Sequence, residues 1–305
     1  MHFTLRQLEY FTATCEAGSV TEAALNIPVA QSSVSAAIAQ LEAALGVQLL
    51  IRHHAQGISM TPAGREFLIH ARALLRQADA LNGLATELSE EVSGRFALGC
   101  LVSLAPMVLA RLCHSFMVKY PRVEVAMSEG GQDELMSRLR SGQLSAALTY
   151  DLDLPADIDF YQLASLPPYA LLPAGHPLTA QPEVTLAQLA PEPLVMLDLP
   201  LSRDYFRGLF LAAGLEPRVV QRSPHVEVVR TLVGNGFGYT ILNAHPQNDL
   251  ALDGSPLARV PITAPARAVT VGLASISMAR PTRLSRAFAE HCRSAIAAAE
   301  IPALT

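Results

Sequence analysis

A group of neutral hydrogen-bonding side chains occupies the stretch PVAQSSVSAAIAQLEAALG, residues 28–46. Gln31, Ser32, Ser33 and Ser35 lie at the beginning of an expected helix. A glutamine can form two hydrogen bonds with adenine, and serine hydroxyls and helical N–H groups can bind phosphate oxygens. The stretch contains no lysine or arginine. If it binds DNA, it must do so mainly through neutral donors and acceptors.

Three helices are expected to position these side chains. Thr4 with Gln7, and Ser19 with Glu22, have the spacing of capping boxes, which begin helices. A third helix ends at Gly46 and carries an apolar face at helical spacing. The second and third helices, joined by a short turn, predict a helix-turn-helix. The apolar face of the third helix comprises Val34, Ile38, Leu41 and Leu45.

The next segment, VQLLIRHHAQGISMT, predicts a two-stranded wing over residues 47–61. A long helix follows, with Thr61 as its cap and Pro62 at its first position. Its apolar residues alternate in steps of four and three, which favours pairing with a helix of a second chain. The alternative is packing against its own domain. The seam consists of Phe67, Ala71, Leu74, Ala78, Leu81, Ala85, Leu88 and Val92, of which Phe67, Leu74, Leu81 and Leu88 are the expected dimerisation residues.

Beyond SGRF, residues 93–96, expected strands and helices alternate, which predicts an α/β domain with mostly parallel sheets. FALGCL, VEVAMSEG and SAALTY are separated by helices over 106–120 and 132–141. After Tyr150, the expected strands ALLPAGHPL, PLVMLDLP, RVVQRS and GYTIL form a second lobe. AVTVGLAS and a helix over 282–299 return to the first lobe. Two lobes joined by crossing strands enclose a cleft, a common place for a small ligand.

Composition narrows the class of protein further. The chain has 305 residues, half of them hydrophobic, with a net charge of -5, so we expect a globular protein of about two domains. No basic segment followed by an apolar run opens the chain, and no uncharged run reaches the roughly 18 residues of a membrane span. The four widely spaced cysteines predict small buried side chains in a reducing cytoplasm.

Enzyme motifs are missing from the sequence. It contains no G-x-S-x-G, no phosphate loop ending in G-K-[ST] and no metal-spaced cluster of His and Glu. GNGFG, residues 234–238, lies between an expected helix and a strand, the reverse of the dinucleotide-binding order. We therefore expect no enzymatic activity and no cofactor. An exported solute-binding protein is a second alternative, but it would need a signal peptide and leaves the N-terminal 92 residues unexplained.

The whole chain resembles the LysR-type transcriptional regulators. The specific motifs are LRQLEYF, GSVTEAA, VAQSSVSAAIAQLEAALGVQLLIR and MTPAG, in family order, and YPRVEV, SGQLSAAL, PAGHPL and LVGNGFGYTIL are looser matches. The resemblance implies an N-terminal winged helix-turn-helix over 1–60, a linker and dimerisation helix over 61–92, and a two-lobed α/β effector-binding domain over 93–305. Lobe I would comprise about 93–164 and 268–305, and lobe II about 165–267. It further implies a cytoplasmic homodimer or homotetramer on an inverted repeat of promoter DNA.

Charge and departures from the family pattern leave the strength of DNA binding open. Ala36 stands where the family usually has arginine, and Ser145 where it usually has aspartate. Residues 1–65 hold three arginines and four glutamates, so nonspecific affinity for phosphates should be modest. A solute sensor of the same architecture with weak or lost DNA binding is therefore the alternative function. The expected DNA-contacting residues are Thr21, Gln31, Ser32, Ser33, Ser35, Arg52, His53 and His54.

The family resemblance also implies that the effector-binding domain is similar to periplasmic solute-binding proteins, and this predicts which residues line the cleft. The turn at Ser103 offers free helical N–H groups, and Arg203 offers a fork suited to a carboxylate. We therefore expect a small anionic effector, such as an organic acid. Alternatively, Arg203 pairs with a surface acid, and His225 is an ordinary residue at a helix start. The expected effector-binding residues are Leu101, Val102, Ser103, Tyr150, Ser202, Arg203, Tyr205 and His225.

Overall fold

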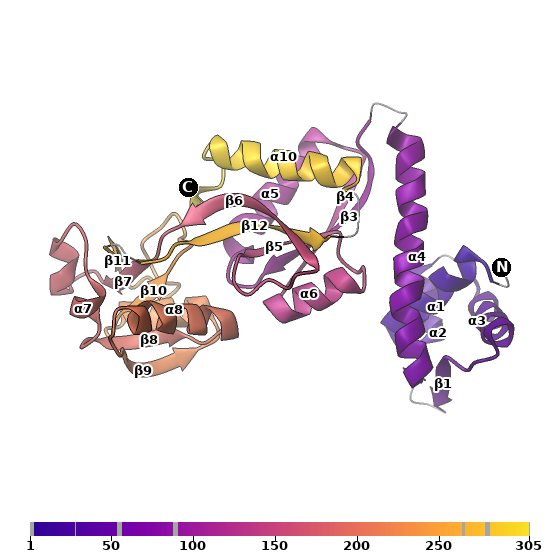
Figure 1. Ribbon diagram of the computed structural model, residues 1–305, viewed down its shortest axis with the longest axis horizontal. Coiled ribbons are helices and arrows are strands. Elements are labelled where there is room, and N and C mark those ends of the chain that lie inside the picture. Colours follow the sequence, from indigo (N-terminus) through magenta and orange to yellow (C-terminus); the bar gives the residue numbers. More distant parts are fainter. Residues whose placement is uncertain are drawn as a thin grey trace. The chain divides into compact units, whose positions relative to one another are not determined.

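The structure is a computed structural model that describes residues 3–27, 29–53, 57–87, 91–263, 266–277 and 281–304 (Figure 1). The chain forms two compact units, Met1–Glu91 with Ser137–Leu144, and Val92–Met136 with Ser145–Thr305. Of the helices in the described ranges, none has both the length and the apolarity to cross a bilayer.

The N-terminal unit begins with the three predicted helices, α1 (Leu5–Ala17), α2 (Val20–Asn26) and α3 (Gln31–Leu45). The capping box of α1 is confirmed, because Thr4 Oγ1 accepts the Gln7 N–H and the Gln7 side chain accepts the Thr4 N–H. Ser19 Oγ accepts the Glu22 N–H at 3.4 Å and caps α2. The predicted apolar face of α3 lies in the core of this unit, with Leu45 only partly buried.

A two-stranded wing follows, as predicted. Strand β1 (Leu50–His53) pairs antiparallel with β2 (Gly57–Met60). The Ile58 N–H donates to the Gly18 carbonyl at 3.0 Å, which ties the wing to the turn between α1 and α2. A Cβ on Gly57 would lie 2.8 Å from that same carbonyl oxygen, and Gly57 has φ of 85°, so this close approach requires glycine.

The long helix α4 (Pro62–Glu87) is capped by Thr61, whose Oγ1 accepts the Gly64 N–H at 2.9 Å. The first turns of its seam pack against their own unit. The Phe67 ring lies edge-on to Phe3 and Phe11, with centroids 6.4 and 5.5 Å away. Ala71 is buried and Leu74 packs against the same core. Phe67 and Leu74 are thus both partly buried against their own unit, and their predicted role in dimerisation stays a prediction.

The second unit contains lobe I, a five-stranded sheet with strand order β4-β3-β5-β12-β6. Strand β3 pairs parallel with β4 and β5, whereas β12 pairs antiparallel with β5 and β6. Helices α5 and α10 lie on one face of this sheet (Figure 1). They meet at the rings of Phe116 and Phe288, whose centroids are 5.0 Å apart. In sequence order the elements are β3 (Gly94–Leu101), α5 (Ala105–Lys119), β4 (Val123–Gly130), α6 (Gln132–Arg140), β5 (Ala146–Tyr150), β6 (Ile158–Leu166), β12 (Val269–Ile276), α10 (Arg283–Ala297) and η2 (Pro302–Leu304).

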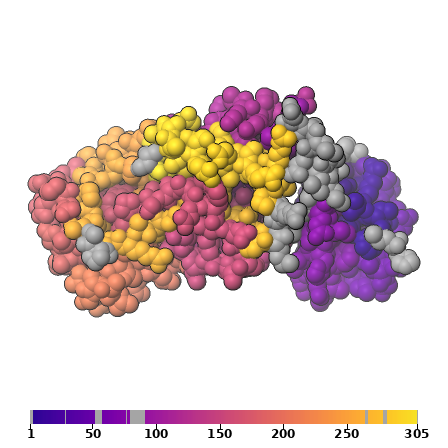
Figure 2. Space-filling view, turned by 45° about the horizontal axis from the view of Figure 1, so that its top comes forward, coloured from indigo at the N-terminus to yellow at the C-terminus, as the bar shows by residue number. Residues whose placement is uncertain are grey.

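Figure 2 shows α10 in yellow beside the pink chain of β6. The guanidinium of Arg293 lies 4.9 Å from the centre of the Tyr161 ring, which joins the helix to that edge strand. Cys100, Cys113 and Cys292 are buried in this lobe and all four described cysteines are free, as predicted. Burial raises the pKa of the Cys113 thiol to about 12, so it stays protonated.

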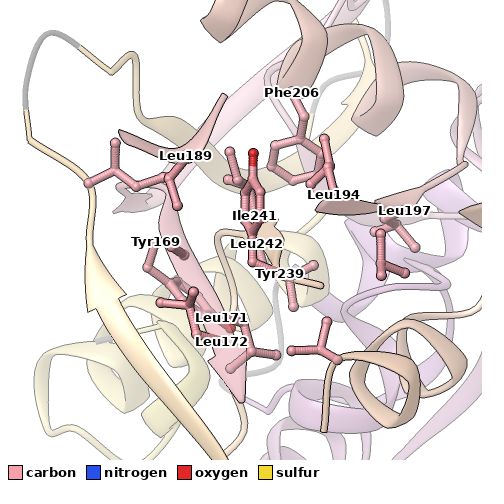
Figure 3. Packing of buried hydrophobic residues seen from close by; sticks show 14 of the residues in the cluster. Tyr169, Leu171, Leu172, Leu189, Leu194, Leu197, Phe206, Tyr239, Ile241 and Leu242 are labelled. Atoms are coloured by element: carbon pink, nitrogen blue, oxygen red, sulfur yellow. The ribbon is translucent and has the colours of Figure 1, made fainter. Parts of the chain in front are cut away.

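Lobe II has two small sheets, β10-β7-β11 and β8-β9, around a continuous apolar core (Figure 3). The three-stranded sheet is antiparallel, and β8 pairs parallel with β9. Phe210, Leu171 and Leu194 are almost fully inaccessible to solvent in this core. Its elements are β7 (Tyr169–Pro173), η1 (Pro177–Ala180), α7 (Leu186–Leu189), β8 (Pro193–Leu197), α8 (Pro200–Ala212), β9 (Arg218–Ser223), α9 (Val226–Gly234), β10 (Thr240–Leu242) and β11 (Leu257–Pro261).

The sheets differ from the predicted ones in strand direction. They are mixed rather than mostly parallel, because the return strand β12 runs opposite to β5 and β6. The chain passes between the lobes after Leu166 and returns before Val269. Asp151 joins strands of lobe I, since its Oδ1 accepts the Thr270 N–H at 2.7 Å.

Candidate functional site

The first candidate surface is the beginning of α3. Gln31, Ser32 and Ser33 are exposed there, Ser35 is half-buried, and Thr21 is exposed on α2. Ala30 occupies the N-cap position of α3, and no side chain, including those of Ser32 and Ser33, forms a capping hydrogen bond. The first helical N–H groups and three exposed polar side chains therefore face solvent together, a combination suited to phosphate oxygens and base edges.

The wing contains three further predicted DNA-contacting residues. Arg52 and His53 belong to strand β1, but their side chains lie outside the described part of the structure. His54 lies outside the described residues altogether, as do Leu88 of the predicted dimer seam and the side chain of Leu81. Their predicted roles stay predictions.

The second candidate site is a pair of adjacent cavities in the second unit. The first is lined by Ser103 and Tyr150 of lobe I and by Ser202 and Tyr205 of lobe II. Leu101 and Val102 line the second cavity, which shares Tyr150 and Ser202 with the first. The second has a volume of about 100 Å³ and the first about 20 Å³. Six of the eight predicted effector residues thus come together around one space.

Arg203 does not line either cavity. Its Nε lies 2.9 Å from Asp204 Oδ1, and its Nη1 lies 3.3 Å from Asp198 Oδ1. The hydrogen bond and charge of Asp204 raise the pKa of this guanidinium, followed by those of Asp198. The structure thus shows the ion pairing that was the alternative for Arg203, and its contact with an effector stays a prediction without support from the cavity lining. His225 is also outside the cavity lining, exposed at the N-cap of α9 without a side-chain capping bond.

The cavity walls are mostly apolar, with a few polar side chains and no basic ones among the described residues. In the described part of the chain, Asp133 is the one charged residue that lines either cavity. Ser103 Oγ is buried and lies next to the Tyr150 side chain at the cavity wall. Burial raises the pKa of the Tyr150 phenol, so this side chain remains a neutral hydroxyl. The cavity therefore offers hydroxyl groups inside a mostly apolar wall.

Three helices begin at the first cavity. Ser103 lies just before α5, Ser202 is in the first turn of α8, and Val226 is the first residue of α9. A helix start presents unpaired N–H groups and a partial positive charge, which favour an acceptor or an anion. Three helix starts therefore lie at the wall of this cavity, whereas Arg203 does not line it.

Two cavity residues escaped the sequence analysis. Asn243 donates through Nδ2 to the Leu166 carbonyl at 3.0 Å and to Tyr205 Oη at 3.3 Å. Gln132, which is buried, accepts a hydrogen bond from Thr149 Oγ1 at 3.0 Å and donates to the Leu152 carbonyl. No local pattern marks either residue, because the four partners lie 17 to 77 positions away in the sequence and two of them are backbone carbonyls. Among the described residues, no group of His, Cys, Asp and Glu is arranged to hold a metal ion.

Comparison with known protein families matches both parts of the chain. Residues 5–65 match the bacterial regulatory helix-turn-helix proteins of the lysR family. Residues 89–297 match the LysR substrate binding domain. The second match alone covers more than half of the chain.

Similar individual proteins are transcriptional regulators. The Escherichia coli K12 protein YnfL, an uncharacterised regulator of the helix-turn-helix type, is 31% identical over 80% of this chain and 83% of its own. The dual regulator GltC of Bacillus subtilis strain 168 is 32% identical over 88% and 89%. The crystal structure of HinK, a LysR family transcriptional regulator from Pseudomonas aeruginosa, has 37% identity and a TM-score of 0.64, covering 96% of this chain and 98% of HinK.

Proposed function

Because the chain belongs to the LysR family of transcriptional regulators, which bind DNA and respond to small molecules, we propose that its effector binds in the two adjacent cavities around Tyr150 and Ser202. The observation that carries this proposal is that hydroxyl groups of both lobes, from Ser103, Tyr150 and Ser202, line one cavity together. A molecule whose polar end pairs with these hydroxyl groups, and whose body fills the apolar remainder, gains affinity.

The cavity walls define the chemistry of the proposed effector. Its body is apolar, because Leu101, Met107 and Phe206 supply much of the lining. Its polar end is an acceptor, such as a carboxylate, placed among the Ser103 and Ser202 hydroxyls and the N–H groups of the helix starts. A carboxylate bound in this way needs no arginine. In this proposal the hydroxyl and helical N–H groups take the role that was predicted for Arg203.

A thermal-shift experiment tests this site. Small carboxylates such as benzoate, and neutral analogues such as benzyl alcohol, are screened for compounds that raise the Tm of the wild-type protein. A ligand at one hundred times its Kd stabilises the native state by about 2.7 kcal/mol. Ser202→Trp fills the shared wall of both cavities and should abolish the shift, whereas Arg203→Met should preserve it. A shift that survives Ser202→Trp would place the binding site elsewhere.

The proposed DNA-contacting residues are Thr21, Gln31, Ser32, Ser33, Ser35, Arg52, His53 and His54. Exposure of the first four of these supports the proposal. We assign residues 1–60 to the DNA-binding domain, 61–92 to a linker helix that forms dimers, and 93–305 to the effector domain, and we place the protein in the cytoplasm as a homodimer or homotetramer. The proposed dimer contacts are Phe67, Leu74, Leu81 and Leu88, of which Phe67 and Leu74 are also partly buried against their own unit.

A further inference from the structure

Two segments of chain connect the lobes. The first runs from the end of β6 at Leu166 to the beginning of β7 at Tyr169. The second runs from β11 to β12, and its described part includes Arg267. Any change in the angle between the lobes must alter the backbone of these two connections.

One pair of side chains holds both connections. Asn243 Nδ2 donates to the Leu166 carbonyl of the first connection at 3.0 Å and to Tyr205 Oη at 3.3 Å. The Tyr205 hydroxyl in turn donates to the Arg267 carbonyl of the second connection. Burial raises the pKa of Tyr205, so its hydroxyl keeps the proton that this bond requires. A continuous hydrogen-bonded path therefore joins the two connections through lobe II.

The same pair lines the first cavity, together with Val269, the first residue of β12 after the second connection. The amide orientation of Asn243 is fixed, because only its NH₂ group can donate to the Leu166 carbonyl. Both of its N–H groups are thus used, and its Oδ1 accepts no hydrogen bond from the described residues. A ligand that donates an O–H or N–H to Oδ1, or that competes for the Tyr205 hydroxyl, would act directly on this path.

We propose that Tyr205 and Asn243 form a hinge latch that couples the contents of the first cavity to the two connections between the lobes. The role of the latch in the response to an effector rests on the proposed function of the cavity. The latch itself rests only on hydrogen bonds within the chain. It assigns to Asn243, a residue without any sequence motif, the role of a positioning residue for both connections.

Hydrogen exchange measured by mass spectrometry on the full-length protein tests the latch. Tyr205→Phe removes the hydroxyl and with it two hydrogen bonds. Amides in peptides covering 164–171 and 266–272 should exchange faster by on the order of fivefold, while amides of β3 and β8 keep their wild-type rates. Asn243→Leu, which removes the amide at similar size, should accelerate the same two segments.

Tyr239→Phe is the matched control. Tyr239 is equally a lobe II tyrosine and is 1% exposed, but its hydroxyl has no hydrogen-bond partner in the described chain. Its removal should leave both connecting segments unchanged. The latch is overturned if Tyr205→Phe behaves like Tyr239→Phe, or if it accelerates all amides of lobe II by the same factor. Since exchange requires no effector, this result is independent of the Ser202→Trp test of the cavity.

Discussion

Glu42 Oε1 accepts the Leu49 N–H at 2.7 Å and the Leu50 N–H at 2.9 Å. This one carboxylate oxygen in the last part of α3 therefore holds the backbone where the wing strand β1 begins. Because Leu49 and Leu50 are buried, their N–H groups have no easy access to water. The contact fixes the position of the wing relative to the helix that carries Gln31 and Ser33.

Replacing Glu42 should therefore lower the stability of the native state. Glu42→Ala leaves two buried N–H groups without an acceptor, and we expect it to lower the free energy of unfolding by about 1–3 kcal/mol. Glu42→Gln keeps a side-chain oxygen and should lose much less. Urea unfolding followed by circular dichroism measures both variants. Equal losses in Glu42→Ala and Glu42→Gln would show that charge, rather than the acceptor, is what matters.

The long helix provides a test of oligomerisation. Leu81→Glu places a charge in the proposed dimer seam, where burial without a partner is unfavourable. Sedimentation velocity should show smaller species, and operator binding should weaken in parallel. Gln77→Glu is the control, because Gln77 is exposed on the same helix and lies outside the seam. If Leu81→Glu sediments like the control, α4 does not form the dimer through this seam.

Arg203→Met should leave the response to effector unchanged. Its guanidinium is engaged by Asp198 and Asp204 outside the cavity lining. Solvent-exposed pairs of this kind contribute little to stability. A reporter gene behind the protein's own upstream region should give the same induction curve for variant and wild type. A rightward shift of tenfold or more in effector concentration would return Arg203 to the binding site.

Stability should fall as the pH drops below about 6.5, the ordinary pKa of histidine. Burial lowers the pKa of His291, whose Nε2 lies 2.8 Å from Ser115 Oγ. The unfolded chain therefore takes up a proton before the folded chain does, and stability is lost between pH 6.5 and the lower folded-state pKa. His245, whose pKa burial also lowers, adds to the same trend.

Tm measured between pH 8 and pH 5 checks this expectation. His291→Gln should flatten the curve in part, whereas a substitution of the exposed His114 to Gln should leave its shape unchanged. A curve that is as steep in His291→Gln as in the wild type would contradict the assigned cause.

The sequence predicted the elements whose signals are local. The Thr4 capping box, the turn at Gly18 and the apolar face of α3 each involve residues within one or two helical turns, and all appear in the structure. Strands β6 and β11 and the short helix α7 were not predicted. The reversed direction of β12 was not predicted either, because strand pairing depends on residues more than a hundred positions apart.

The predicted residues that line the cavities lie at or near strand ends and helix starts, as Ser103, Tyr150 and Ser202 do. The sequence alone could not assign the partner of the α4 seam, because an apolar residue at heptad spacing, such as Phe67, fits its own core as well as a partner helix. The pairing of Arg203 could not be decided from the sequence, because the acids at positions 198 and 204 compete with a ligand for its guanidinium. Asn243 carried no signal, since one of its partners is the backbone carbonyl of Leu166, 77 positions away.

The most direct test of DNA recognition is a quantitative gel shift on the protein's own upstream region, comparing wild type with Gln31→Ala. The wild-type protein should bind one fragment specifically. Its salt dependence should be shallower than that of a protein with ten phosphate contacts, because residues 1–65 contain only three arginines. Gln31→Ala, an exposed change that spares the core, should weaken specific binding by about tenfold. Wild-type affinity in Gln31→Ala would contradict recognition by the neutral start of α3, and the absence of any specific complex would favour a sensor that has lost DNA binding.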